Sequence, residues 1–266
     1  MIEMNWRPRL GELTWEEVKE GLQHTDLIVI PVGATEQHGP HLPLCTDSMN
    51  IQTVAEEAAH IERVFVAPTL VYGVSDNHMA FAGTISLRPR TLIDLLLDVA
   101  RSLHSHGFRR LLLLNGHGGN IDSMGVAAHE LRAALPEAVV AFSDLVGFVY
   151  DGYEPTSGII YHADEGETAH SLAVAPNLVK MDRAVGEVTD AFGTYYARYF
   201  AAVGEMSGLI SYGLPPTDIM TASGVMGDAT AATLEAGERM HEVAVRGLCR
   251  IVQDLKASRP FGESRT

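Results

Sequence analysis

The sequence lacks the features of several protein classes. It has only two cysteines, Cys45 and Cys249, which lie far apart and outside any C-x-x-C spacing. So few thiols in a chain of this length are typical of a reducing compartment. The longest apolar runs, 27–32 and 111–114, are far too short to cross a bilayer. The first ten residues contain no apolar stretch of signal-peptide length. We therefore expect a cytoplasmic protein with no membrane partner.

Positive charge is also scarce. The chain has 19 lysines and arginines against 34 aspartates and glutamates, a net charge of −15. A surface this acidic repels phosphate backbones and anionic head groups, which argues against nucleic acid as a partner. No internal repeat is visible, and neither a G-x-S-x-G string nor a P-loop is present. Serine-hydrolase and phosphate-transfer chemistry therefore lose support.

Apolar residues are abundant enough for a large core. The chain has 266 residues, 46% of them hydrophobic, which favours one α/β domain over residues 1–266. Apolar runs at 27–33, 64–68, 111–114 and 138–142 predict strands, the first of them buried on both faces. Helices are predicted at 14–23, 90–106, 122–135 and 229–255, the first opening with a capping box at Thr14 and Glu17. This alternation predicts a mainly parallel sheet with helices on both faces.

Polar, glycine-rich segments directly follow two of these strands, and ligands bind beyond the carboxyl ends of such sheets. Glu36 and His38 stand two residues apart, so in extended chain they point the same way. Asp47 follows a loop with two prolines, at the expected start of the next helix, where its carboxylate could bridge two cations. His117 lies between glycines, which permit close backbone approach.

A third segment, 161–168, combines His162 with the carboxylates Asp164, Glu165 and Glu167, and leads into a helix predicted from about Thr168. Mixed imidazole and carboxylate ligands suit zinc, manganese or iron. Two such divalent ions about 3.5–4 Å apart could polarise a carbonyl and lower the pKa of a bridging water toward neutrality. The pattern predicts hydrolysis by a metal-bridging hydroxide without a protein nucleophile.

At these residues the sequence resembles the creatininase family of amidohydrolases. The matching strings lie at 36–44 with Asp47, at 83–87, at 114–120 and at 162–168, and the resemblance covers roughly residues 10–250. It implies a three-layer α/β/α sandwich around a mainly parallel sheet and a site for two divalent ions. It also implies a homo-oligomer, a hexamer in the family's pattern.

The resemblance implies specific ligands. Glu36 and His117 would bind one metal, His38 the other, and Asp47 would bridge them. In creatininase proper, a glutamate in the segment matching 115–120 completes the second site, but here that place holds Gly119.

The missing ligand is expected from Glu167, which matches the family's Glu-Thr pair at a helix start, or from Glu165. His162 would shuttle a proton to the leaving nitrogen, and Glu165 is a second catalytic candidate. Either carboxylate could instead only stabilise the N-terminus of a helix.

The resemblance also bears on the substrate. The loop at 75–78 borders the substrate in the family, so Ser75 and His78 are expected contacts, although Ser-Asp-Asn also favours a simple turn. Creatininase proper carries a tryptophan–aspartate pair where this chain has Gly158 and Ile159, which argues against creatinine. We expect hydrolysis of a non-peptide C–N bond in a small polar amide, lactam or formamide. The alternatives are a peptidase of peptide-derived cofactor maturation, a metal-dependent lyase or isomerase, and a non-catalytic binding module.

Overall fold

The computed structural model describes residues 6–144, 153, 155–156, 161–187 and 216–259. Its main sheet is parallel, in the order β2-β1-β3-β4. β1 (Leu27–Val32) pairs with β3 (Arg110–Asn115) over its full length, so both strands end at the same edge. β4 (Val139–Asp144) flanks β3, and β2 (Phe65–Val66) is shorter than the predicted run at 64–68.

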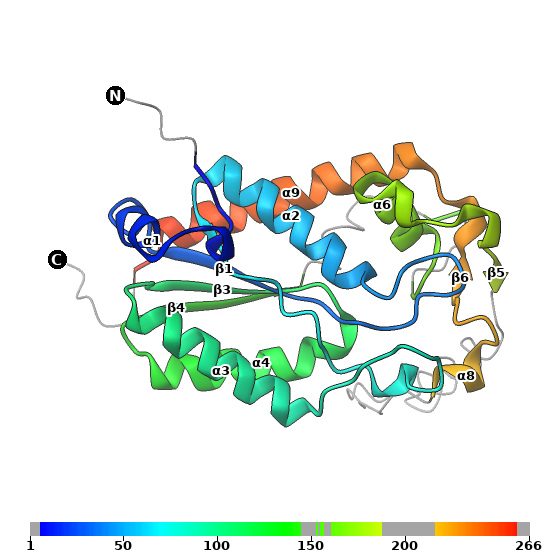
Figure 1. The fold of residues 1–266 in the computed structure, drawn as a ribbon, viewed down its shortest axis with the longest axis horizontal. Helices are drawn as coiled ribbons and strands as arrows, with labels where there is room; N and C mark the ends of the chain where they lie inside the picture. The colour runs from blue at the N-terminus through cyan, green and yellow to red at the C-terminus, as the bar shows by residue number, and fades with distance from the viewer. Residues whose placement is uncertain (1–5, 145–152, 154, 157–160, 188–215, 260–266) are drawn as a thin grey trace, which may run out of the picture.

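Alternate residues of the central strands face different helix layers. Ile28 and Ile30 pack with α3 (Pro89–Ser105) and α4 (Ile121–Ala134), whereas Leu27 and Val29 pack with α2 (Thr46–Glu62) and α9 (Leu234–Ala257). Figure 1 shows α2 and α9 on one side of the sheet and α3 and α4 on the other. Burial on both faces explains the continuous apolar runs. The predicted three-layer α/β/α architecture is confirmed.

Side-chain caps fix where the helices begin. The predicted capping box is present at α1 (Trp15–Gly21), where Thr14 and Glu17 bond reciprocally. The helix predicted from Thr168 begins three residues earlier, as α6 (Glu165–Val174), because the Asp164 carboxylate accepts the N–H groups of Gly166 and Glu167. The helix predicted from Ala229 begins only at Leu234, because a 3-10 turn, η6 (Ala229–Ala231), comes first. Both predicted starts were wrong because the prediction took no account of the residues that come before the first helical turn.

Short elements complete the described chain. The strands β5 (Gly186–Glu187) and β6 (Gly227–Asp228) pair antiparallel, and α8 (Thr217–Met220) is a single turn. With α6 they gather beyond one end of the sheet (Figure 1). The 3-10 turns are η1 (Leu10–Glu12), η2 (Asp76–His78), η3 (Gly118–Asn120), η4 (Pro176–Leu178) and η5 (Met181–Arg183). None of the helices in the described ranges is long and apolar enough to cross a membrane.

Candidate metal centre

Two buried ligand-type side chains, Glu36 and His38, lie in the loop between β1 and α2. A hydrogen bond from Glu36 N to Leu44 O (3.0 Å) closes this loop. His38 Nδ1 lies 3.2 Å from the backbone oxygen of Glu36. Because a carbonyl oxygen can only accept, Nδ1 carries the proton of the neutral imidazole, and Nε2 then has the lone pair. His38 Nε2 is thus the atom available to bind a metal.

Asp47 stands between two imidazoles. It lies in the first turn of α2, at the predicted helix start, and its side chain is buried. Its Oδ1 is 3.1 Å from His38 Nε2, and its Oδ2 is 3.2 Å from His117 Nδ1. One carboxylate therefore reaches two histidines from different loops, which is the arrangement that a bridging ligand requires.

His117 follows β3 and is anchored on the neighbouring loop. Its Nε2 donates to Val74 O (2.8 Å) and lies 3.4 Å from Glu36 Oε2, which leaves Nδ1 free on the Asp47 side. A Cβ at Gly119 would lie 2.1 Å from Val74 O and 2.6 Å from His117 Nε2. A glutamate at Gly119 therefore could not fit here unless both the backbone at Val74 and the His117 ring moved.

The two candidate glutamates of α6 point to different places. Glu167 Oε2 lies 3.7 Å from His38 Nε2. Glu165 instead accepts from the Tyr153 hydroxyl (2.6 Å) and from the backbone N–H of Thr156 (2.7 Å). Glu167 therefore lies at the cluster, whereas both carboxylate oxygens of Glu165 bond to residues outside the cluster.

His162 also reaches the cluster. It precedes α6 and forms an isolated bridge with Met226. Its Nε2 lies 2.8 Å from the backbone oxygen of Gln37, and its Nδ1 lies 3.8 Å from Glu36 Oε1. The ring centroid is 4.5 Å from that of His38.

These side chains fit divalent cations. Within the described residues, three groups could each hold an ion, with ligand atoms within 4.8 Å of one another: Glu36–Asp47–His117, His38–His162–Glu167 and Glu36–His78–His162. Three ligand-type atoms, Glu36 Oε2, His38 Nε2 and Asp47 Oδ2, are buried without a hydrogen-bond partner. Unpartnered buried polar atoms are costly, and bound cations would satisfy them.

The charges of the cluster shift its pKa values. Burial by itself would lower the pKa of His38, but the carboxylates of Asp47 and Glu167 outweigh it and raise that pKa to about 10. Burial would likewise lower the pKa of His117, and Glu36 with Asp47 raises it to about 9. Burial raises the pKa of Glu36, and that of Glu167 to about 8. In the absence of metal, His38, His117 and Glu167 therefore hold protons near pH 7 that cations would displace.

The predicted substrate loop borders the cluster. Ser75 Oγ lies 3.2 Å from His117 Nε2, and His78 Nε2 lies 3.8 Å from Glu36 Oε1. Both side chains are buried, and residues 76–78 also form the expected turn, as η2. Burial, followed by the charges of His38 and His117, lowers the pKa of His78 to about 3. Gly158 and Ile159, on which the argument against creatinine rests, lie outside the described residues.

Sequence reasoning missed two residues that organise the site. Gln37, 4% exposed, contacts both His78 and His162 through its amide. Asp164 sets the start of α6, and its spacing from Glu167 is that of a capping box, a signal present in the sequence. For Gln37 no periodicity or motif chemistry gives a comparable signal.

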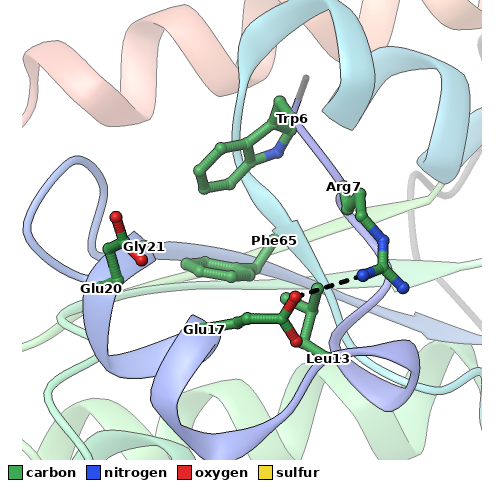
Figure 2. Close-up of a pocket in the computed structure, with 7 residues that line it drawn as sticks. All are labelled: Trp6, Arg7, Leu13, Glu17, Glu20, Gly21 and Phe65. Carbon is green, nitrogen blue, oxygen red and sulfur yellow. Dashed lines mark hydrogen bonds and ion pairs between the residues drawn. The ribbon is translucent and has the colours of Figure 1, made fainter. Parts of the chain in front are cut away.

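A cavity of about 180 Å³ lies away from the cluster, beside α1 (Figure 2). The rings of Trp6 and Phe65 meet there edge to face, and Arg7 pairs with Glu17 at 3.3 Å. None of the cluster residues lines it. The metal-type chemistry and this cavity are therefore separate features.

Comparison with known proteins identifies relatives along the whole chain. Residues 11–252 match the family model described as creatininase, creatinine amidohydrolase. The 3-dehydro-scyllo-inosose hydrolase of Thermotoga maritima is 29% identical, over 94% of this chain and 84% of its own. The creatinine amidohydrolase of Pseudomonas putida is 30% identical, over 92% and 96%. The mycofactocin precursor peptide peptidase of Mycolicibacterium smegmatis is 33% identical, over 83% and 82%.

Solved structures agree. A putative creatinine amidohydrolase from Bacteroides fragilis superposes with a TM-score of 0.79 at 26% identity, covering 99% of this chain and 100% of its own. A manganese creatininase gives 0.75, and a zinc–zinc form of a creatininase mutant gives 0.74, each at 29% identity over 92% of this chain and 97% of its own. Since the family model spans nearly the whole chain, this protein belongs to the creatininase family and is a metal-dependent amidohydrolase.

Proposed function

We propose that this chain is a two-metal hydrolase that cleaves a non-peptide C–N bond, in an amide, lactam or formamide of a small polar substrate. The observation that carries the proposal is the position of Asp47, whose two oxygens lie 3.1 and 3.2 Å from His38 and His117. Each imidazole turns a free nitrogen toward this carboxylate because its other nitrogen is held by a backbone carbonyl. Such second contacts fix the orientation of metal-binding histidines.

The ligands divide into two sets that share Asp47. Glu36 and His117 Nδ1 would hold one ion, and His38 Nε2 with Glu167 would hold the other. Zinc or manganese suits these donors, and relatives have been solved with each. When bound, a pair of divalent ions polarises a carbonyl group and lowers the pKa of a water molecule between them.

His162 would move the proton. Its Nε2 donates to the Gln37 backbone oxygen, so its Nδ1 presents a lone pair toward the cluster. Burial lowers the pKa of His162 well below its ordinary value, so the ring is neutral near pH 7 and Nδ1 keeps its lone pair. We assign it to accept the proton of the attacking water at Nδ1 and to pass it to the departing nitrogen.

A peptide substrate is the second candidate. The relative from M. smegmatis is a precursor peptide peptidase, and it is 33% identical to this chain. The same ligands and the same proton carrier would serve a peptide bond. The two candidate functions therefore differ only in which substrate the site accepts. All three relatives described above are hydrolases by name, which favours hydrolysis over a lyase or isomerase reaction.

The test is metal content followed by hydrolysis. Protein purified without chelator should contain two equivalents of zinc or manganese per chain, and Asp47→Asn should lose both. Asp122→Asn is the matched control, because Asp122 also lies in the first turn of a helix but is exposed. Lactams, formamides and short peptides are then screened with and without chelator. A parent protein that binds no metal after re-addition, or hydrolysis that is insensitive to chelator, would overturn the proposal.

A further inference from the structure

The amide of Gln37 has a fixed orientation. Its Oε1 accepts the backbone N–H of Gly39 (2.9 Å), and its Nε2 donates to the backbone oxygen of Gly224 (3.1 Å). A backbone N–H only donates and a carbonyl only accepts, so exchanging the amide oxygen and nitrogen would break both bonds. Gly224 has φ +86°, and a Cβ there would lie 1.9 Å from Gln37 Oε1. The loop thus approaches the amide more closely than a side chain at Gly224 would permit.

One of the two hydrogens on Gln37 Nε2 binds the Gly224 oxygen, so only one hydrogen remains to donate to a histidine. Gln37 Nε2 lies 2.8 Å from His162 Nε2 and 2.9 Å from His78 Nδ1. His162 Nε2 also lies 2.8 Å from the Gln37 backbone oxygen, so it already carries a proton and cannot accept another. The remaining amide hydrogen therefore goes to His78 Nδ1.

His78 consequently differs from His38, His117 and His162, because it turns an N–H group and not a lone pair toward the cluster. Its Nδ1 accepts from Gln37, and the second neighbour of that atom, the Thr217 hydroxyl at 3.1 Å, can also donate. The ring proton must then be on Nε2, which faces Glu36 Oε1 at 3.8 Å. His162 Nδ1 faces the same oxygen, also at 3.8 Å, but as a bare lone pair.

We infer that Gln37 is a positioning residue that makes His78 present an N–H group and His162 a lone pair to the same side of Glu36. Resting on the proposed function, the inference gives His78 the task of donating a hydrogen bond to the substrate's carbonyl oxygen, where negative charge develops during hydrolysis. The two rings lie 4.3 Å apart between centroids, so donor and acceptor are held side by side. Gln37 would thus give two like residues different roles, His78 through its side-chain amide and His162 through its backbone oxygen.

The same reasoning argues against a third cation at Glu36, His78 and His162. The separations of 3.8 Å from Glu36 Oε1 to each imidazole would suit a shared ion. Ligation through His78 Nε2, however, would move the ring proton to Nδ1, which faces the Gln37 N–H at 2.9 Å. Two donors would then point at each other in a buried site, which is unfavourable.

Imidazole tautomers are measurable by NMR without any substrate. We would record long-range ¹⁵N–¹H correlations on ¹⁵N-labelled, zinc-loaded protein and assign the two rings from His78→Gln and His162→Gln. The expected parent spectrum has His78 protonated at Nε2 with a bare Nδ1. Protonation of His78 at Nδ1 in the parent overturns the inference, even if Gln37→Glu does not fold.

Gln37→Glu sharpens the test, because its carboxylate has no hydrogen to donate. The His78 proton should move to Nδ1, whereas His162 should keep its proton on Nε2, since its partner is the unchanged backbone oxygen of residue 37. A purely structural role would move both rings or neither, and either result refutes the inference. Gln52→Glu is the control, because Gln52 bonds only Glu56 in the described chain and should leave both rings unchanged. Zinc content is measured on the parent sample: two equivalents with an Nδ1-protonated His78 in the parent would overturn this inference alone, and no zinc in the parent would overturn the proposed function.

Discussion

The adjacent glycines after His117 provide a geometric test of the metal centre. A Cβ at Gly119 would lie 2.1 Å from Val74 O and 2.6 Å from His117 Nε2, the two atoms that form a 2.8 Å hydrogen bond. A Cβ at Gly118 meets no heavy atom within 4 Å among the described residues. Gly119→Ala therefore places a methyl group between His117 and its anchor, and Gly118→Ala is the same substitution one residue earlier in open space.

The expected cost follows from these distances. Ordinary contact between non-bonded carbon atoms is about 3.5–4.0 Å, so the loop or the imidazole must move by about 1 Å or more. Overpacking of this kind together with a lost hydrogen bond costs about 2–4 kcal/mol. In a chain of this size that lowers the thermal midpoint by about 5–10 °C. The loss of His117's anchor should also weaken metal binding by about 10–100-fold.

Two assays on both variants separate the outcomes. Thermal unfolding of the chelator-treated protein measures the steric cost, and zinc titration of the folded protein measures the effect on His117. Gly118→Ala should stay within about 0.5 kcal/mol of the parent, with unchanged zinc affinity. If Gly119→Ala behaves like Gly118→Ala in both assays, the placement of His117 against Val74 is wrong, and so is the assignment of its Nδ1 as a ligand.

Three further predictions concern α6. Glu167→Gln should bind one equivalent of zinc fewer than the parent in elemental analysis, whereas Glu165→Gln should bind the full complement; equal losses would contradict the assignment. Asp164→Ala should lower the free energy of unfolding in urea by about 0.5–2 kcal/mol, because the helix cap is lost. It should also weaken zinc binding, because Glu167 is displaced. A variant with parental stability and parental zinc affinity would refute the role of Asp164 as the cap that positions Glu167. Burial, then the charge of His241, lowers the pKa of His170 to about 3 from 6.5, so the folded state keeps this ring neutral while the unfolded chain takes up a proton below pH 6.5. This contribution to stability is present above pH 6.5 and is lost as the pH falls toward 3. Between pH 7.5 and 5 the loss amounts to about 2 kcal/mol in the free energy of unfolding. Urea unfolding at both pH values measures it, and this loss should be absent in His170→Gln.

The layers of the fold were predictable because the pattern of apolar residues reflects which faces of the strands and helices are buried. The run at 27–32 is apolar throughout because β1 is covered on both faces, and this holds for β3 also. Helix starts were less predictable, because a start depends on which side chain turns back onto the backbone. Asp164 was named only as one of three carboxylates in the segment 161–168, whereas its carboxylate defines the first turn of α6.

The clustering of the candidate ligands was predictable for a different reason. Imidazole and carboxylate groups that follow neighbouring parallel strands must converge, because those strands end at one edge. Spacing alone could not choose between Glu165 and Glu167, since both lie in the first turn of one helix. The choice depends on Tyr153 and Thr156, which take the oxygens of Glu165 and lie outside every motif. The role of Gln37 is harder still to predict, because it depends on two backbone groups, at Gly39 and Gly224, that are far apart in sequence.

Gly119 and Asp164 are physically linked in the proposed two-metal site. Gly119 leaves no room for a glutamate beside His117, so the second ion of the proposed site would need a carboxylate from another element. Glu167 can supply it only if the first turn of α6 is held in place, since a shift of one residue would turn its side chain away from His38. Asp164 holds that turn by accepting the backbone N–H of Glu167 itself (3.0 Å). A ligand carried by a helix thus depends on the cap of that helix, and substitutions at Asp164 and Glu167 should affect zinc affinity non-additively, as expected for residues that act as one unit.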